Sequence, residues 1–164
     1  MKRSPISTVA ALVLITFAMV FAQARPDFSG KWRFNSGKSS RGTQGNTPDM
    51  IYPSDLTLKH TAAELQFVGS SLRQADVKAV YKLDGSEVLV TSDPGITERA
   101  KATWEGVNLV ISSKRIVPSP GGGNFITDIK QVWSLKDGKL MIEETQSAEG
   151  LSTTGTFVFD KIGS

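Results

Sequence analysis

Cysteine is absent from this chain of 164 residues, and histidine occurs once. Without cysteine there can be no disulfide, no thiol nucleophile and no cysteine-ligated zinc. A single histidine excludes a metal site built from several histidines. Aromatic residues make up only 8% and charged residues 21% of the chain, while 39% is hydrophobic. This is the composition of an ordinary globular protein, so neither extended disorder nor a collagen-like structure is expected.

The net charge gives little sign of a charged partner. The formal charge is +3, but Lys2 and Arg3 lie in a segment that we expect to be removed, which leaves 17 basic residues against 16 acidic ones. A balance this even provides no electrostatic footprint for nucleic acid or for an anionic membrane. We therefore expect no nucleic-acid partner.

Residues 1–24 have the three parts of a secretory signal peptide. A basic start, a mostly apolar stretch at residues 9–22 and the small-x-small sequence Ala22-Gln23-Ala24 follow one another. The apolar stretch is shorter than the ~20 residues that cross a bilayer, so no membrane-spanning anchor is expected. The sequence therefore predicts a cleaved signal peptide at 1–24, one mature domain at 25–164, and a periplasmic or extracellular location.

The mature chain alternates apolar and polar residues over short runs. In one run, Val77, Ala79, Tyr81 and Leu83 share a face while Lys78 and its neighbours take the other. This period of two is typical of strands with one buried face. We expect strands at roughly 29–34, 55–60, 64–71, 76–83, 87–91, 98–104, 107–117, 125–135, 139–148 and 152–161.

Short turns connect many of these runs. They are Asp84-Gly85, Glu105-Gly106, Asp137-Gly138 and Glu149-Gly150, in which the glycine tolerates a positive φ angle. Strands joined this closely are antiparallel neighbours, and eight to ten of them with one apolar face each favour a closed barrel or a sandwich. The connection at residues 35–54 is longer, polar and rich in Gly and Ser.

The opening of the mature chain carries a family resemblance. The pattern Phe28-Ser29-Gly30-x-Trp32-x-x-Asn35-x-x-Lys38-Ser39 resembles the first strand of lipocalin-like (calycin-type) barrels in a group of small exported bacterial proteins. Residues 101–111 and 133–142 resemble two later hairpins of these proteins, and residues 157–161 their closing strand. The resemblance implies an all-β fold, a single antiparallel up-and-down barrel of eight to ten strands. It implies a fold rather than a reaction.

One position departs from the pattern of these barrels. Calycins usually carry an arginine on the last strand that packs over the tryptophan of the first strand. Here only Lys161 is available for that place over Trp32. Lysine and arginine are not equivalent in such a contact, because only arginine presents a planar group that stacks.

Counting residues away from the turns predicts which inward side chains face one another. In one hairpin Glu98 lies opposite Arg115, and in the next two Glu144 lies opposite Gln131 and Gly155. Each inner face then runs from apolar residues near one end of the barrel to polar residues farther on. Burying such charges costs free energy unless they pair or meet water or a ligand.

The sequence thus predicts a non-catalytic barrel that binds a small, apolar or amphipathic ligand. A cavity with an apolar floor and a few convergent polar groups is typical of such sites. The predicted ligand-binding residues are Phe67, Tyr81, Glu98, Arg115, Gln131, Trp133, Glu144 and Phe157. The same residues also permit a filled barrel with a structural Arg115–Glu98 pair, which would serve as a structural or protein-interaction module.

The chain shows no recognisable catalytic signature. His60 ends a strand without a nucleophile elbow, and Glu143 and Glu144 point to opposite faces of theirs. Gly121-Gly122-Gly123 lacks the lysine and the helix of a phosphate loop. We therefore expect no catalysis, cofactor or metal, and we also expect a monomer. An enzyme of another type would need a bound reactive species or a perturbed acid near Glu144.

A barrel of the outer membrane is a further alternative. It requires an outward apolar band. The outward positions instead carry charged residues, among them Lys78, Lys82, Lys101, Asp128, Lys130 and Glu143. This pattern argues against a membrane barrel.

Overall fold

The computed structural model describes residues 24–40, 42, 52–71, 74–90 and 95–163. Within these residues the chain forms ten strands and no helix, so the predicted all-β fold is confirmed. Each observed strand agrees with its predicted range to within two residues at either end. The strands are β1 (Gly30–Phe34), β2 (Asp55–His60), β3 (Glu64–Ser71), β4 (Gln74–Lys82), β5 (Val88–Val90), β6 (Thr97–Glu105), β7 (Asn108–Pro118), β8 (Asn124–Lys136), β9 (Lys139–Ala148) and β10 (Leu151–Gly163).

Two sequence predictions fall wholly or partly outside the described residues. All of the expected signal peptide except Ala24 lies outside them, and so does the middle of the long connection at residues 35–54. No helix among the residues with a described structure is long and apolar enough to cross a membrane.

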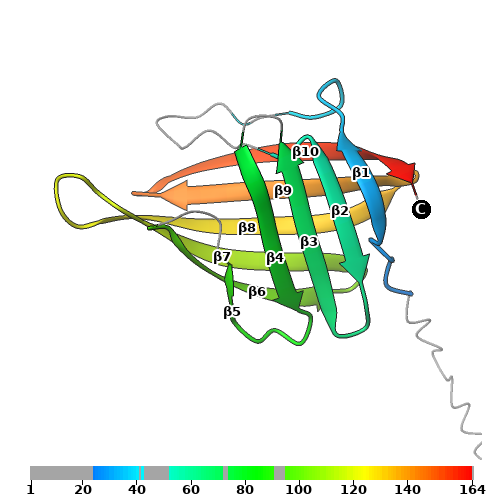
Figure 1. Ribbon diagram of the computed structural model, residues 1–164, viewed down its shortest axis with the longest axis horizontal. Coiled ribbons are helices and arrows are strands. Elements are labelled where there is room, and N and C mark those ends of the chain that lie inside the picture. The colour runs from blue at the N-terminus through cyan, green and yellow to red at the C-terminus, as the bar shows by residue number, and fades with distance from the viewer. Residues whose placement is uncertain (1–23, 41, 43–51, 72–73, 91–94, 164) are drawn as a thin grey trace, which may run out of the picture.

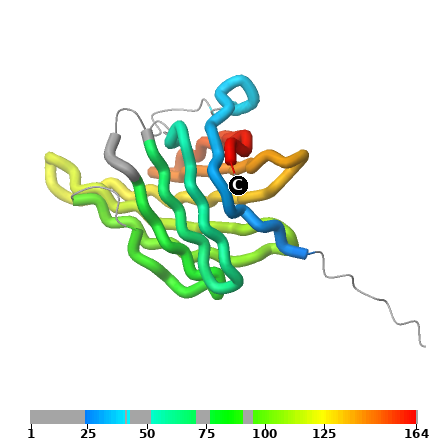
Figure 2. The backbone as a smooth tube through the Cα atoms, turned by 45° about the vertical axis from the view of Figure 1, so that its right-hand side comes forward, coloured from blue at the N-terminus to red at the C-terminus, as the bar shows by residue number. Residues whose placement is uncertain are grey.

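The ten strands form one antiparallel sheet that curls into a nearly closed barrel. Its order is β4-β3-β2-β1-β10-β9-β8-β7-β6-β5, so the first strand pairs with the last. Strands β1–β4 cross steeply in front of β6–β10 (Figure 1), and β1 lies beside the C-terminal end of the chain (Figure 2). The described parts of β4 and β5 lie next to each other, but no ladder of hydrogen bonds joins them. This seam is where the ring of strands stays open.

Two of the hairpins have the backbone geometry that their sequences predict. Asp137 and Gly138 have φ angles of 51° and 71°, and Glu149 and Gly150 have 51° and 80°. Two successive positive φ angles define the turn whose twist matches that of the flanking strands. These turns set the register of β8, β9 and β10. A shift of one residue in the pairing would move the buried side chains of a strand to the solvent face of the sheet.

The two crossed halves of the sheet enclose an apolar core. The largest fully buried side chains include Trp32, Trp133, Phe28, Phe157, Phe159, Leu140 and Ile142. Phe28 precedes β1 and stacks on Trp104 with their ring centroids 5.9 Å apart, and the indole N–H of Trp32 donates to the Phe28 carbonyl at 2.9 Å. The N-terminal segment thereby closes one end of the barrel, which we call the apolar end.

Candidate ligand-binding site

The predicted register of the long hairpins is the observed one. Glu98 pairs with Arg115, and Glu144 pairs with both Gln131 and Gly155. These inward positions lie on one side of the barrel, beyond the row that contains Trp133 and Phe157. The side chains that meet there form what we call the polar cluster: Tyr52, Tyr81, Glu98, Ser113, Arg115, Gln131, Glu144 and Gln146.

Glu144 is the centre of a hydrogen-bond network within the polar cluster. The Gln131 amide donates to its Oε2 at 2.7 Å, and the Gln146 amide donates to its Oε1 at 2.8 Å. The Tyr52 hydroxyl donates to the same Oε2 that Gln131 contacts. The Trp133 indole N–H donates to Gln131 Oε1 at 3.0 Å and so orients that amide. Glu144 is 4% exposed, and these donors replace the water that burial removes.

Tyr52 reaches this network from the segment before β2. Its ring stacks on Phe157, with the centroids 3.9 Å apart and the planes 25° from parallel, and its hydroxyl also accepts from the Gln131 amide at 3.1 Å. An aromatic side chain with a polar tip is suited to such a boundary, where an apolar wall meets a polar group. Burial, and after it the neighbouring Glu144 carboxylate, raises the pKa of Tyr52 well above its ordinary value.

A second pair lies nearer to the open seam. Arg115 Nε donates to Glu98 Oε2 at 2.8 Å, and the Ser113 hydroxyl donates to Glu98 Oε1 at 2.8 Å. Glu98 is buried, whereas the side chain of Arg115 is 38% exposed. Arg115 therefore joins the buried cluster to the solvent.

Tyr81 faces this pair from β4, on the other half of the sheet. Burial raises the pKa of Tyr81, and the negative charges of Glu98 and Glu144 raise it further, while Arg115 lowers it. The polar cluster therefore lies between the two crossed halves of the sheet, with Tyr52 and Tyr81 on one side and the long strands β6–β9 on the other.

The predicted site residues are brought together in the barrel interior. Trp133 and Phe157 form the apolar wall beneath the polar cluster, and both are fully buried. Phe67 of β3 is half-buried and meets the edge of Trp133, with ring centroids 6.2 Å apart. Their role in ligand binding stays a prediction.

Sequence reasoning missed Tyr52 and Gln146. The sequence pattern could have identified both as inward residues. Tyr52 is an even number of residues from Leu56 and Leu58, and Gln146 is an even number of residues from Ile142 and Glu144, so each shares the inward face of these neighbours. Tyr52 lies in a connection whose sequence does not alternate like a strand, and Gln146 is one of several polar residues near the end of its strand.

A separate hollow lies on the outer surface. It is a groove of about 580 Å³ across the outward faces of β6, β7, β8 and β9, lined by Arg99, Lys101, Ser112, Lys114, Asp128 and Lys130 among others. Arg99 is paired with Glu87 at 3.1 Å, and Lys114 with Asp128 at 3.3 Å. The predicted cavity was expected inside the barrel, whereas this groove is lined mainly by outward side chains, and Ser113 of the polar cluster also borders it.

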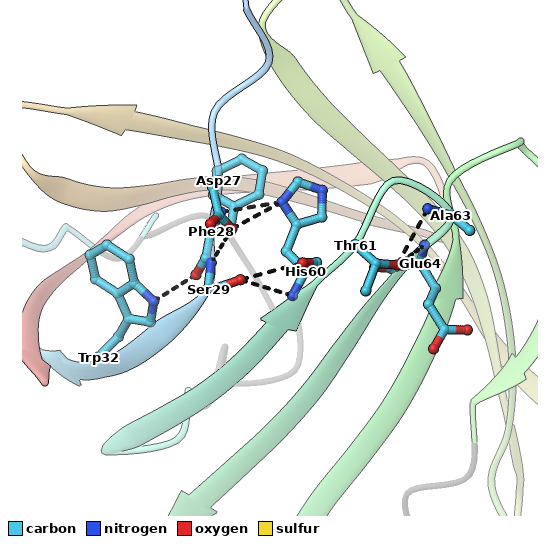
Figure 3. Close-up of polar contacts among 8 residues, drawn as sticks. All are labelled: Asp27, Phe28, Ser29, Trp32, His60, Thr61, Ala63 and Glu64. Carbon is cyan, nitrogen blue, oxygen red and sulfur yellow. Dashed lines mark hydrogen bonds and ion pairs between the residues drawn. The ribbon is translucent and has the colours of Figure 1, made fainter. Parts of the chain in front are cut away.

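Ser29, His60 and Asp27 meet at the apolar end (Figure 3). The Ser29 hydroxyl donates to the His60 carbonyl at 3.4 Å and accepts from the His60 main-chain N–H at 3.1 Å. His60 Nδ1 accepts from the Phe28 N–H at 3.3 Å and lies 3.4 Å from Asp27 Oδ1. Because the serine contacts the main chain and not the imidazole, the group lacks the nucleophile–base pair of a catalytic triad.

The same group of residues anchors the segment before β1. Hydrogen bonds from Ser29 lower the pKa of Asp27, and the charge of His60 adds to the effect. The His60 imidazole at the end of β2 thus has partners in the Phe28 N–H and the Asp27 carboxylate. In the described part of the chain, no three His, Asp or Glu side chains are grouped so as to hold a metal ion.

Neither a protein-family model nor a curated protein matches the chain by sequence. Solved structures do match its fold. The ileal bile acid-binding protein of zebrafish, crystallised with cholic acid, is 17% identical with a TM-score of 0.59, over 82% of this chain and 98% of that chain. The secretory abundant heat soluble protein 4 of Ramazzottius varieornatus is 20% identical with a TM-score of 0.51, over 82% and 94% of the two chains. The likeness shows that this chain has a lipocalin-like barrel fold.

Proposed function

We propose that this chain is a non-catalytic carrier of a small amphipathic molecule, bound with its polar head at the polar cluster. The observation that carries the proposal is the convergence of charged and amide side chains from β6 to β9 inside an otherwise apolar barrel. Burying such groups costs free energy unless they pair or bind a ligand. A few convergent polar groups above an apolar wall are typical of ligand sites. The zebrafish protein of the same fold, crystallised with cholic acid, supports a role in binding.

In this proposal the ligand body packs against Phe67, Tyr81, Trp133 and Phe157, and the polar cluster, with Arg115 and Glu98 held as an ion pair, orients the head. Each buried methylene of the ligand would contribute about 0.8 kcal/mol. The open seam between β4 and β5 leads to Tyr81 and Glu98 and is the proposed way in. As part of the proposal the protein is exported after cleavage behind Ala24 and acts as a monomer.

The indole N–H groups allow a direct test. The chain has three tryptophans; the Trp133 indole donates into the polar cluster, and the Trp32 indole donates at the apolar end. In an NMR titration of the 15N-labelled mature protein with decanol, the Trp133 indole resonance is expected to shift while that of Trp32 stays. No shift of Trp133 with decanol, and none with a lipid extract, would refute binding in the interior.

A matched pair of variants sharpens this test. Arg115 pairs with Glu98 of β6 inside the barrel, whereas Arg99 pairs with Glu87, just before β5, on the outer surface. Arg115→Ala is expected to weaken binding several-fold, whereas Arg99→Ala should leave it unchanged. Equal binding by both variants would contradict the proposed position of the ligand head.

The outer groove favours a second candidate, a protein-interaction module with a filled barrel. Most of its basic side chains are exposed, and aromatic and aliphatic side chains are buried in the described interior. The same titration separates the two candidates. A partner or ligand in the groove would shift main-chain resonances of β6–β8 around Lys101 and Lys130 and leave the Trp133 indole unchanged.

A further inference from the structure

The donors and acceptors of the polar cluster have unambiguous roles. The Gln146 amide lies 2.8 Å from Glu144 Oε1, so its nitrogen must face the carboxylate, because the opposite orientation would set two oxygens against each other. Gln131 is oriented in the same way by the Trp133 indole, which can only donate. The amide N–H groups of Gln131 and Gln146 therefore both donate to the Glu144 carboxylate.

This arrangement leaves the oxygen of the Gln146 amide without a partner among the described residues. Gln146 is 5% exposed, and its Oε1 accepts no hydrogen bond from any residue that the structure describes. A buried acceptor that is left unpaired costs free energy, so such atoms in folded proteins usually meet a water molecule or a ligand. What this position lacks is a hydrogen-bond donor.

The charges of the polar cluster also select against an anion. Among the described side chains that meet there, Glu98 and Glu144 are acidic and Arg115 is basic, so the cluster carries one net negative charge. The guanidinium is already committed to Glu98 through Nε and is partly exposed to solvent. The raised pKa values of both tyrosines agree with a buried environment that disfavours further negative charge.

We infer that the polar cluster selects an amphipathic ligand whose head donates hydrogen bonds and carries no negative charge, an amine more strongly than an alcohol, with the head placed at Gln146 Oε1. The inference rests on the proposed function and concerns the same site. A hydroxyl or ammonium group would supply the donor that Gln146 lacks. An ammonium would in addition compensate the excess negative charge, whereas a carboxylate would increase it.

Four probes built on a ten-carbon chain test the inference: decylamine, decanol, methyl decanoate and decanoate. Each is titrated below its solubility limit or micelle concentration, with the Trp133 indole resonance as the measure of binding. Decanol is expected to bind about tenfold more tightly than methyl decanoate, which cannot donate, and decylamine more tightly again. Decanoate is expected to bind most weakly. Decanoate binding as tightly as decylamine, or the ester as tightly as the alcohol, would overturn the inference.

These results are distinguishable from a failure of the proposed function. If none of the four probes shifts the Trp133 indole, the barrel does not bind an amphipath in its interior and the function itself is refuted. If decanoate binds best, the binding function stands and only the inferred class of ligand is wrong.

Two sets of variants test the assigned atoms. Gln146→Leu should abolish the preference for alcohol over ester, whereas Gln66→Leu, on the outer face of β3, should retain it. The double variant Glu98→Gln/Glu144→Gln leaves Arg115 as the charge of the cluster and should reverse the order of decylamine and decanoate. Glu143→Gln, adjacent in the chain but outward, should keep the original order. A retained preference in the double variant, with a folded spectrum, would contradict the charge argument.

Discussion

The two ends of the barrel interior bury side chains of different chemistry. At the apolar end Trp32, Phe28 and Leu140 are almost completely buried, and the Trp32 indole nitrogen donates to the Phe28 carbonyl. At the polar cluster, Glu144 alone accepts from three side chains. The interior of one barrel thus combines an apolar end that stabilises the fold with a polar cluster whose groups are suited to recognising a ligand.

The difference between the ends has a physical consequence for stability. Apolar burial is favourable wherever a side chain leaves water. A buried polar network only balances the loss of hydration, and each incomplete hydrogen bond makes the balance worse. We therefore expect the apolar end to dominate the free energy of unfolding and the polar cluster to dominate ligand specificity.

The largest expected effect is on the apolar end. Trp32→Ala removes a side chain that is 1% exposed and leaves the Phe28 carbonyl without its donor. The free energy of unfolding should fall by about 3–5 kcal/mol in urea denaturation followed by circular dichroism. Trp32→Phe, which keeps most of the volume, should lose less. A loss below about 1 kcal/mol for the alanine variant would show that Trp32 is not central to the stability of the apolar end.

An intermediate effect is expected at the polar cluster at high pH. The pKa values of Tyr52 and Tyr81 are both raised from the ordinary value of 10.0. Their contribution to stability is complete below about pH 10 and is lost as the pH rises, because the unfolded chain can ionise these phenols and the folded chain cannot. The free energy of unfolding should fall by about 1.4 kcal/mol per pH unit for each tyrosine above that pH.

The measurement is direct because the chain contains only two tyrosines, both in the polar cluster. The tyrosinate absorbance of the folded protein should stay low above about pH 10 and appear on unfolding. Tyr52→Phe and Tyr81→Phe should each halve the slope. Ordinary titration of both phenols in the folded protein would show that the cluster is open to solvent.

The smallest expected effect concerns the outer covering of the apolar end. Lys161 Nζ lies 5.5 Å from the centre of the Trp32 ring, so lysine does occupy the position where calycins usually carry arginine. Lys161→Ala should destabilise the protein by about 0.5–1 kcal/mol, and Lys161→Arg should restore or exceed the original stability. Lys136→Ala at the exposed end of β8 is the control. If Lys161→Ala and this control have the same unfolding temperature, the Lys161 ammonium does not stabilise the apolar end.

Most of the barrel was predictable because its strands carry a local signal. Alternation along Val77–Leu83 identified an inward face, and the turns at Asp137-Gly138 and Glu149-Gly150 set the register that placed Glu144 opposite Gln131 and Gly155. The predicted contacts between neighbouring strands therefore followed from counting.

Contacts across the barrel were not predictable in this way. Tyr52 reaches Glu144 over a separation of 92 residues, and Tyr81 faces Glu98 and Glu144 from the other half of the sheet. No period or turn in the sequence relates these positions. The groove on the outer surface was likewise unexpected, because it depends on how the sheet bends and not on which residues alternate.

The amino-acid sequence by itself determined the all-β fold, the strand positions and which side chains point inward, since each depends on residues close together in the chain. The tertiary structure decided which inward side chains meet across the barrel and which amide oxygen is left without a donor. Those properties depend on the closure of the sheet and on the exact approach of its two halves, where a hydrogen bond is made or lost over less than 1 Å.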